Sequence, residues 1–196
     1  MLRLKNVTKT YYMGETKLDV LKKINLTIKR EDFVAIMGPS GSGKSTLLHI
    51  LGALDRPTKG TVFIDNKDIN QLDDDELAQI RLKKIGFIFQ FFYLIPSLNA
   101  LKNVMLPMSI AGASREDRKE DAKKLLKLVG LVDRMYHMPR QLSGGQRQRV
   151  AVARAMANNP EIIFADEPTG NLDTKSGNEI MKILRQLNKE KKVTIV

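Results

Sequence analysis

Apolar and polar positions alternate near the start of the chain. Ile24, Leu26 and Ile28 are separated by polar residues, and the segment 2–7 shows the same period. A period of two is typical of half-buried antiparallel strands. The opening of the chain therefore predicts a small antiparallel β layer.

From residue 33 onward, continuous apolar runs alternate with segments of helical period. The apolar runs predict buried strands at 33–37, 61–64, 85–89 and 161–165, with a further strand beginning at 193. The helical periods predict helices at 44–52, from about 73 to 82, and around 180–187. This order predicts an α/β fold with a mostly parallel sheet.

Between residues 90 and 158 the strand signals stop. Apolar residues at 122, 125, 126 and 129 predict a helix that follows a capping-box pattern at Ser114 and Asp117. A second helix is predicted to start near Ser143 and run toward Pro160. We expect one domain over 1–196, in which a core with its β layer (1–89 and 159–196) is interrupted by a helical subdomain (90–158).

The strongest chemical signal lies between the predicted strand 33–37 and the helix that follows. Its spacing is G-x-x-x-x-G-K-S, in which glycines let backbone N–H groups turn toward phosphate oxygens. The next helix presents its positive end, Lys44 adds a cation, and the Ser45 hydroxyl can complete a magnesium shell. A plain glycine-rich turn would not explain this joint match. The predicted nucleoside triphosphate site comprises Gly38, Pro39, Ser40, Gly41, Ser42, Gly43, Lys44, Ser45 and Thr46.

Two carboxylates, Asp166 and Glu167, end the apolar run 161–165. Open α/β sheets bind ligands at this edge. Asp166 would orient magnesium or its water, and Glu167 would polarise the water that attacks the γ-phosphate. Alone, such a pair more often marks an ordinary strand end, but together with the phosphate loop it predicts a magnesium and water site.

A second phosphate-binding surface is predicted at the residues Ser143, Gly144, Gly145 and Gln146. Ser143 can cap a helix while the two glycines expose backbone N–H groups to an anion. Because only one loop carries a lysine, we expect this second surface to address a nucleotide held by another subunit. The alternative is a capped helix start with a flexible turn.

The motifs stand in a characteristic order: the phosphate loop, Gln90 after a strand, Leu142–Gln146, and then Asp166 with Glu167. In this order the chain resembles the ATP-binding-cassette ATPases over essentially its whole length. The resemblance implies ATP and Mg²⁺ sandwiched head to tail between two cassettes of a homodimer. It also implies that the loop Asn171–Asp173 links the two nucleotide sites across the dimer.

The resemblance implies residue roles as well. Gln90 would sense magnesium and the attacking water, although it is also simply a polar residue at a strand end. Tyr11 would stack on adenine, which makes 9–14 part of the pocket, unless Tyr11 packs on the sheet or its neighbour Tyr12 takes its place. The predicted catalytic residues are Lys44, Gln90 and Glu167, and the predicted magnesium ligands are Ser45, Gln90 and Asp166.

Residues 89–96 and 166–173 resemble the branch that serves lipoprotein release, macrolide efflux and related export. The implied partner is a separate membrane permease, whose cytoplasmic helix would rest in a groove near Gln90 to Pro107. No apolar stretch approaches the roughly 20 residues of a spanning helix, and 1–8 does not read as a secretory signal. We therefore expect a cytoplasmic ATPase, peripheral on the inner face of the cell membrane.

The formal charge of +11 would also suit a nucleic-acid binder. We expect no nucleic-acid partner, because the chain lacks the long coiled-coil insertion or second cassette that relatives acting on DNA or ribosomes carry. Such a soluble ATPase nevertheless stays an alternative, and a nucleotide-gated binding module is another. Arg147, Arg149 and Arg154 are expected on the helix surface or at a subunit interface.

The last residues raise a separate expectation. In the resembled family, a histidine that contacts the γ-phosphate follows the strand equivalent to 193–196, and this sequence ends before it. The chain therefore resembles a C-terminally truncated cassette, for which slow hydrolysis is expected. The binding-module alternative is favoured if that histidine is essential.

Overall fold

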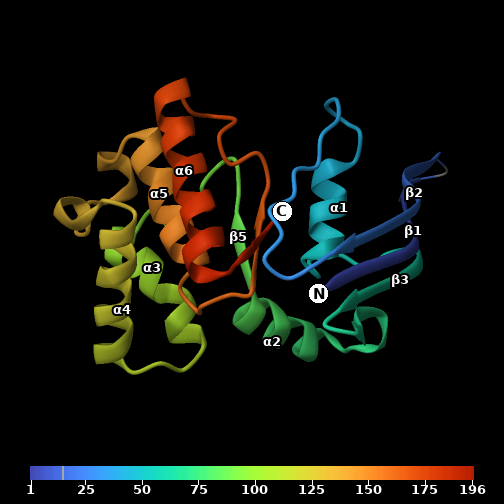
Figure 1. Ribbon diagram of the computed structural model, residues 1–196, viewed down its shortest axis with the longest axis horizontal. Helices are drawn as coiled ribbons and strands as arrows, with labels where there is room; N and C mark the ends of the chain where they lie inside the picture. The colour runs from blue at the N-terminus through green and yellow to red at the C-terminus, as the bar shows by residue number, and fades with distance from the viewer. Residues whose placement is uncertain (15) are drawn as a thin grey trace.

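Four strands between residues 2 and 68 form an antiparallel β layer. The computed structural model describes residues 1–14 and 16–196. Strand β1 (Leu2–Met13) pairs antiparallel with β2 (Thr16–Ile28) on one side and with β3 (Lys59–Ile64) on the other. The short β4 (Lys67–Asp68) extends the sheet to the order β2-β1-β3-β4. The predicted antiparallel layer is confirmed (Figure 1).

A parallel sheet forms the centre of the molecule. Its strands are β5 (Ile85–Ile88), β6 (Ile162–Ala165) and β7 (Thr194–Ile195), in the order β5-β6-β7. Strand β6 lies in the middle and pairs in parallel with both neighbours. Its continuous apolar sequence suits a strand that is covered on both faces. The predicted α/β class with a mostly parallel core is confirmed.

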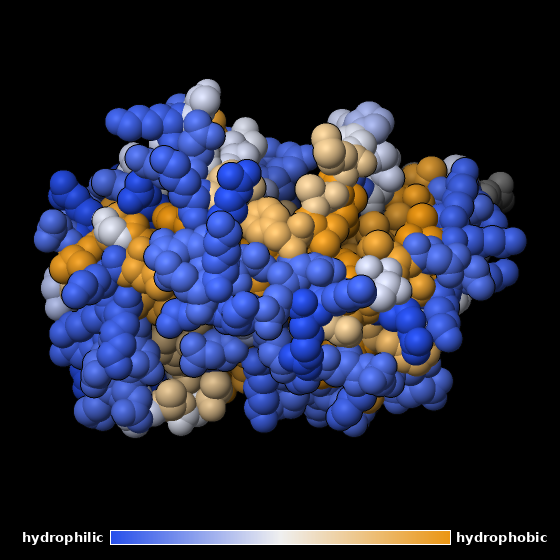
Figure 2. Space-filling view, in the orientation of Figure 1, coloured by the Kyte–Doolittle hydropathy of each residue, from blue (hydrophilic) through white to orange (hydrophobic). Residues whose placement is uncertain are grey.

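The predicted strand at 33–37 is wrong in extent. Phe33 forms a single parallel bridge with Ile195, and the Val34 amide donates to the Ile195 carbonyl at 2.8 Å. Among the described residues, no backbone hydrogen bond joins 35–37 to a strand. Phe33, Ala35 and Met37 are exposed, and Figure 2 shows apolar surface in the hollow between α6 and the segment leading to α1. Apolar sequence alone does not make a strand, because a strand also needs a neighbour.

Six α-helices surround the two sheets in the described part of the chain. Helices α1 (Lys44–Leu51) and α2 (Asp74–Lys84) lie near the β layer. Helices α3 (Ala100–Ile110), α4 (Arg115–Leu128), α5 (Gly144–Ala155) and α6 (Thr174–Lys191) lie on the other side of β5 (Figure 1). Three 3₁₀ turns complete the list, at Ile69–Gln71, Val132–Arg134 and Pro139–Gln141. None of the described helices is both long and apolar enough to cross a membrane.

Side-chain caps explain where most helices begin. Asp73, Asn99, Ser114, Ser143 and Asp173 each accept a backbone N–H from the first turn of their helix. The acidic segment at the start of α2 includes a complete capping box, as its sequence suggested. Helix α5 ends at Ala155, short of the expected Pro160, and the chain then turns through Asn159 at φ 49°.

Two hydrophobic clusters meet at the parallel sheet. Alternate residues of β6 serve different clusters, as the period of a strand requires. Ile162 and Phe164 pack with the β layer, α1 and α2, whereas Ile163 packs with helices α3 to α6. All three are essentially buried. Strand β6 is therefore the shared wall between the two halves of the core.

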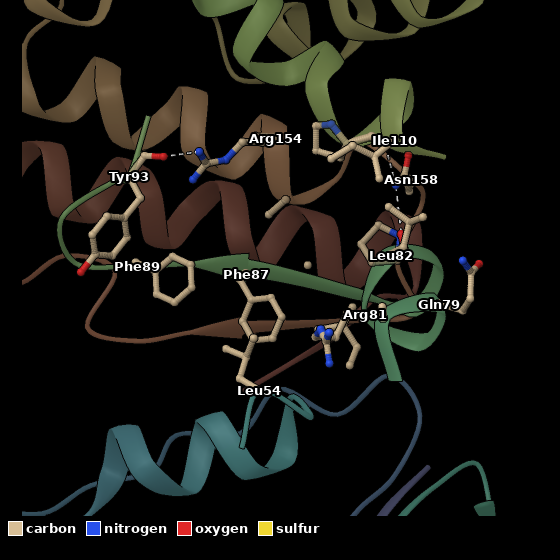
Figure 3. Close-up of a pocket in the computed structure, with 16 residues that line it drawn as sticks. Leu54, Gln79, Arg81, Leu82, Phe87, Phe89, Tyr93, Ile110, Arg154 and Asn158 are labelled. Atoms are coloured by element: carbon tan, nitrogen blue, oxygen red, sulfur yellow. Dashed lines mark hydrogen bonds between the residues drawn. The ribbon is translucent and has the colours of Figure 1, made fainter. Parts of the chain in front are cut away.

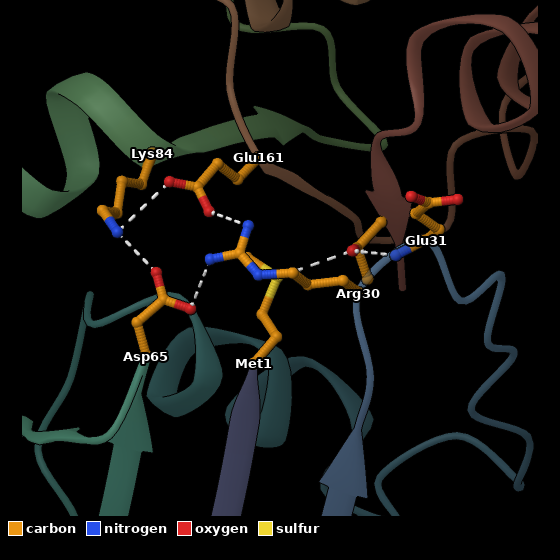
Figure 4. Close-up of polar contacts among 7 residues, drawn as sticks. Met1, Arg30, Glu31, Asp65, Lys84 and Glu161 are labelled. Atoms are coloured by element: carbon orange, nitrogen blue, oxygen red, sulfur yellow. Dashed lines mark hydrogen bonds and ion pairs between the residues drawn. The ribbon is translucent and has the colours of Figure 1, made fainter.

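Four charged side chains join the β layer to the parallel sheet (Figure 4). Lys84 contacts Asp65 at 2.5 Å and Glu161 at 3.2 Å, and Arg30 contacts the same two carboxylates at 2.9 and 2.6 Å. These residues come from the end of α2, the turn after β3, the segment before β6 and the segment after β2. We call the group the ionic joint. Each charge has two opposite partners, which lets a half-buried network remain paired.

Candidate nucleotide-binding site

The phosphate loop leads directly into α1. Gly41 and Gly43 have φ of 76° and 91°, a left-handed backbone that glycine adopts without strain. Gly43 is the N-cap residue of α1, and no side chain caps this helix. Among the described α-helices α1 is alone in this, because α2 to α6 all have side-chain caps. Its first N–H groups thus remain for an anion, at the positive end of the helix dipole.

Lys44 and Ser45 stand at the first positions of α1. The Lys44 ammonium donates to the carbonyls of Gly38 and Pro39 at 3.0 and 2.9 Å, which holds the cation across the loop. The Ser45 hydroxyl donates to Asp166 Oδ1 at 3.0 Å. The structure therefore brings the end of the phosphate loop against the end of β6. An adjacent hydroxyl and carboxylate fit Mg²⁺, which takes few protein oxygens when a phosphate supplies others.

Lys44, Asp166 and Glu167 line one cavity of about 230 Å³. Its remaining walls are mainly apolar, from 33–36, α6 and the residues near β7. Glu167 is exposed and has φ 46°, an uncommon conformation for a residue with a side chain. The Gly170 amide donates to the Glu167 carbonyl at 3.0 Å, so a tight turn holds this geometry. A carboxylate is thereby presented to the cavity by a constrained backbone, which is common at functional sites.

Gln90 lies beside the turn that follows Glu167. Asn171 Nδ2 donates to the Gln90 carbonyl at 3.1 Å. Gly170 faces the Gln90 amide so closely that a Cβ on it would lie 2.9 Å from Gln90 Nε2. The loops after β5 and β6 therefore pack against each other, as expected for neighbouring parallel strands whose ends share one edge.

Tyr11 is tied to the segment that follows α1. Its hydroxyl donates to Asp55 Oδ2 at 2.9 Å, and Lys9 Nζ lies 4.9 Å from its ring centre. Burial and the Asp55 carboxylate raise the pKa of Tyr11. Burial favours a raised pKa at Asp55 too, but hydrogen bonds from Lys9 and Tyr11 outweigh it and lower the pKa. Tyr11 is 36 % exposed and tethered, whereas Tyr12 is 69 % exposed, so Tyr11 is the better-positioned aromatic.

The residues Ser143 to Gln146, which we call the signature segment, form a separate surface. Ser143 Oγ accepts the Gln146 amide at 3.2 Å, and Gln146 Oε1 accepts the Ser143 amide at 2.9 Å, which completes a capping box. Ser143, Gly145 and Gln146 line a polar cavity of about 540 Å³ that contains none of the phosphate-loop residues. The structure thus brings Lys44, Ser45, Asp166 and Glu167 together, and keeps the signature segment apart from them.

A third cavity, of about 600 Å³, opens beside Phe89, the residue before Gln90 in the sequence (Figure 3). Its walls come from α2, β5, the end of α3 and the end of α5, and they include Phe87, Phe89, Tyr93 and Ile110. The rings of Phe87 and Phe89 stack at 5.8 Å. This hollow is mainly apolar, and it lies between the β5–α2 region and the helices that follow.

The sequence did not predict the contacts that two arginines and a glutamine of α5 make within the chain. Arg154 donates to the carbonyls of Phe92 and Tyr93, and Arg149 donates to Glu179 and to the Val129 carbonyl. Both arginines thus have partners within the chain and are only partly exposed, while a position at a subunit interface stays a prediction. Gln148 is fully buried. Its only sequence signal is a polar residue on the apolar face of a helix.

Comparisons with known proteins agree with this geometry. A profile of the ABC transporter family matches residues 21–170. The uncharacterized ABC transporter ATP-binding protein MJ0796 of Methanocaldococcus jannaschii is 59 % identical over 200 residues, which cover 100 % of this chain and 85 % of the relative. The dimeric post-hydrolysis structure of the MJ0796 cassette bound to ADP and Pi has a TM-score of 0.93 at 56 % identity, covering 100 % of this chain and 86 % of that one.

Two further relatives have names that state a transport system. The lipoprotein-releasing system ATP-binding protein LolD of Geobacter metallireducens is 49 % identical over 196 residues, covering 100 % of this chain and 87 % of LolD. The macrolide export ATP-binding/permease protein MacB of Bdellovibrio bacteriovorus is 53 % identical over 198 residues, covering 100 % of this chain and 30 % of MacB. Together with the family match over residues 21–170, these identities show that the chain belongs to the ABC transporter family, as an ATP-binding cassette.

Proposed function

We propose that this chain is the ATP-hydrolysing subunit of a membrane export complex, and that it works as a head-to-tail homodimer on the cytoplasmic face of a permease. The single observation that carries the proposal is the meeting of Lys44, Ser45, Asp166 and Glu167 at one sheet edge. The names of LolD and MacB support the export branch. In this scheme 1–89 and 159–196 form the core, and 90–158 forms the helical subdomain.

The phosphate loop binds the triphosphate of ATP through backbone N–H groups. Uncapped N–H groups at the start of α1 and the left-handed glycines form the cradle. Lys44 exchanges its loop carbonyls for phosphate oxygens, which cancels negative charge. Tyr11 stacks on the adenine. Ser45, Asp166 and Gln90 would hold Mg²⁺, which supplies charge neutralisation between the phosphates.

Glu167 acts on the attacking water. It stands one residue beyond Asp166 on the wall of the same cavity. Its carboxylate accepts a proton from the water as the water oxygen bonds to the γ-phosphorus, and the bond from that phosphorus to the bridging oxygen breaks, which releases ADP and phosphate. Gln90 orients that water from the adjacent loop. The tight turn that fixes Glu167 limits its freedom, which lowers the entropy cost of reaching the reactive geometry.

Ser143 to Gln146 bind the nucleotide of the partner subunit. They lie in a different cavity from the phosphate loop of their own chain, so one chain cannot close both around one nucleotide without a second copy. The dimeric structures of MJ0796 support this arrangement. A two-fold pair then builds two composite sites, and closing them is the motion that drives transport.

The apolar hollow beside Phe89 receives a cytoplasmic helix of the permease. It combines an aromatic wall with an opening of about 600 Å³, which suits a few apolar side chains of a docked helix. Its residues flank the loop that carries Gln90, so a permease helix docked there contacts the same loop that orients the water. This contact provides a direct path between hydrolysis and the membrane subunit.

The central experiment separates binding from hydrolysis. Glu167→Gln keeps the size and shape of the side chain but removes the base, so we expect unchanged ATP affinity and a loss of turnover of about 10²- to 10⁴-fold. Asp166→Asn is the matched control, and it should weaken magnesium-dependent ATP binding instead. Single-turnover hydrolysis and equilibrium nucleotide binding measure the two effects. Turnover of Glu167→Gln within about threefold of the parent, with chemistry rate-limiting, removes Glu167 from this role.

A mixing experiment tests the composite sites. Ser143→Arg should block dimer closure and leave the ATP affinity of the monomer unchanged, because the added side chain fills the partner's nucleotide space. A heterodimer of Ser143→Arg with Lys44→Ala places both defects in one site and leaves the other site intact. Neither variant homodimer should hydrolyse ATP, so recovery of ATP hydrolysis at one site per heterodimer is the expected result. No recovery contradicts the head-to-tail arrangement.

A further inference from the structure

Gln148 is a buried amide in the first half of α5. Its side chain is 0 % exposed, among apolar neighbours on the same helix such as Val150 and Val152. A polar group in such a place is normally satisfied by hydrogen bonds. The partners of those hydrogen bonds therefore indicate the role of the side chain.

Its amide nitrogen bridges two loops of the candidate site. Gln148 Nε2 donates to the Pro168 carbonyl at 2.6 Å and to the Phe89 carbonyl at 3.4 Å. Both acceptors are carbonyl oxygens, so only the NH₂ group of the amide can face them. Pro168 follows Glu167, and Phe89 precedes Gln90. One side chain thus reaches the backbone beside both residues that are proposed to act on the water.

Packing alone does not account for this residue. Gln148 Oε1 is buried and has no hydrogen-bond partner among the residues that the structure describes. An unpaired buried acceptor is destabilising, whereas a methionine of similar length would fill the same space without one. The unpaired oxygen offsets part of the stability that the two donated hydrogen bonds contribute, and those bonds fix the distance between α5 and the two loops.

The bridge begins close to the signature segment. Gln148 stands two residues after Gln146 on the same helix, which starts at the Ser143 cap. A helix moves as a rigid unit over such a distance, because each turn is held by its own backbone hydrogen bonds. A shift at the start of α5 therefore reaches the carbonyls of Phe89 and Pro168 without a flexible link.

We propose that Gln148 is a positioning residue for hydrolysis: it sets the loops of Gln90 and Glu167 relative to the signature helix, so that engagement of a partner's nucleotide at Ser143 aligns the attacking water. This inference rests on the proposed function. Gln148 touches neither nucleotide nor water, and it acts through the backbone of its two neighbours.

The test uses variants that keep the volume of the side chain. Gln148→Met removes the donor, and Gln148→Glu turns an oxygen toward the two carbonyls. We expect the kcat for ATP in the full chain to fall by about 10- to 100-fold in Gln148→Met, with KM and monomer ATP affinity within about twofold of the parent, because a small misplacement affects the transition state alone. Gln148→Glu should lose at least as much.

Asn103→Leu provides the matched control. Asn103 is also a helical amide with 0 % exposure, but it donates to the carbonyls of Ile95, Leu98 and Asn99, away from Glu167. Asn103→Leu should lower thermal stability and leave kcat per folded molecule within about twofold. Equal falls of kcat in Asn103→Leu and Gln148→Met would reduce the role of Gln148 to general stability and overturn the proposal.

Hydrogen exchange supplies a readout that does not need hydrolysis. Gln148→Met should lose amide protection in both 89–93 and 166–171, while Asn103→Leu should lose neither. Unchanged protection in both segments overturns the proposal, whatever the turnover. If the parent chain binds ATP but never hydrolyses it, the proposed function fails, and the exchange result still decides whether Gln148 positions the two loops.

Discussion

Two groups of polar contacts connect the elements of this molecule. One consists of ion pairs between side chains, and the other consists of hydrogen bonds from side chains to backbone carbonyls. The ionic joint connects ends of regular elements through four charges, each with two partners. The second, which we call the carbonyl joint, connects α5 to loops through side-chain donors and backbone acceptors. Its donors are Gln148 and Arg154, and its acceptors are the carbonyls of Phe89, Phe92, Tyr93 and Pro168.

The backbone beside each joint also differs. Phe92, Tyr93 and Glu167, which lie in or next to the carbonyl joint, have φ of 62°, 45° and 46°. Such conformations persist only where the surroundings hold them. Of the charged residues of the ionic joint, Lys84 ends a helix and Arg30 and Glu161 flank strands, while Asp65 lies in a turn at φ 48°. The ionic joint therefore serves stability between elements, while the carbonyl joint determines the shape of loops that carry the chemistry.

The largest effect is expected from breaking the carbonyl joint at Arg154. Burial lowers the pKa of its guanidinium, and two loop carbonyls accept its hydrogen bonds. Arg154→Met leaves those carbonyls unpaired and should reduce the free energy of unfolding by about 2–3 kcal/mol. The loss should be concentrated in the loop, as a fall in amide protection over 91–95 measured by hydrogen exchange.

Arg147→Met is the control for Arg154→Met, because Arg147 reaches the same loop without donating to a carbonyl of it. Its guanidinium lies 5.1 Å from the Phe92 ring centre. Loss of that cation–π contact should cost about 0.5–1 kcal/mol and leave loop protection unchanged. A loss of loop protection in Arg147→Met equal to that in Arg154→Met would mean that charge near the loop, and not the hydrogen bonds, fixes its shape.

A smaller effect is expected from breaking the ionic joint at Asp65. Burial alone would raise the pKa of Asp65, but the hydrogen bond from Lys84 and the charges of Lys84 and Arg30 lower it below its ordinary 3.8. Because this carboxylate is only partly exposed, Asp65→Asn should lower the free energy of unfolding by about 1–2 kcal/mol near pH 7. Local protection of 91–95 should stay unchanged, which separates the two joints.

The pH dependence of the Asp65→Asn difference has a definite sign. A pKa that is lower in the folded chain means that the contribution of Asp65 is complete well above pH 3.8 and is lost as the pH falls through the lowered value. Parent and variant should therefore differ by a constant amount from about pH 7 to 5 and converge at more acidic pH. Urea unfolding at each pH measures the difference in free energy of unfolding between parent and variant. If that difference stayed constant down to the most acidic pH, it would arise from packing and not from the charge of Asp65.

The sequence predicted the β layer and the parallel sheet, and structure confirmed both. Period and apolar runs report which residues are buried, and burial is enough to place elements such as β5 and β6. The wrong extent of 33–37 has the same origin: its apolar pattern is intact, but pairing depends on a strand that lies far away in the sequence. Roles of the site residues stay predictions, although Ser45 and Asp166 do meet.

The carbonyl joint was beyond prediction for a different reason. Backbone carbonyls are present at every residue, so no sequence pattern tells which of them will accept a distant side chain. Arg154 lies on a helix whose polar residues suggest a solvent face, yet a loop more than sixty positions away covers it. The charged pairs of the ionic joint suffer from the same limitation, because opposite charges are too frequent in a sequence to select partners.

The smallest effect on stability is expected from an exposed group on α4, in which one lysine contacts two carboxylates as in the ionic joint. Lys124 contacts Glu120 at 2.8 Å and Asp121 at 3.1 Å, much as Lys84 contacts two carboxylates. The hydrogen bonds that Lys124 donates to these two carboxylates raise its pKa. All three side chains are more than half exposed, at 65 %, 70 % and 57 %, whereas those of Lys84, Asp65 and Glu161 are 35 % or less.

Lys124→Gln should leave the unfolding midpoint in urea unchanged within error, since water and salt screen exposed pairs. Lys84→Gln, with the same number of broken contacts, should shift the midpoint by an amount comparable to Asp65→Asn. Repeating both at about 1 M salt should leave the Lys84 effect largely in place, because partly buried pairs are screened less. Equal shifts for the two lysines would show that counting contacts, and not exposure, predicts the strength of a joint.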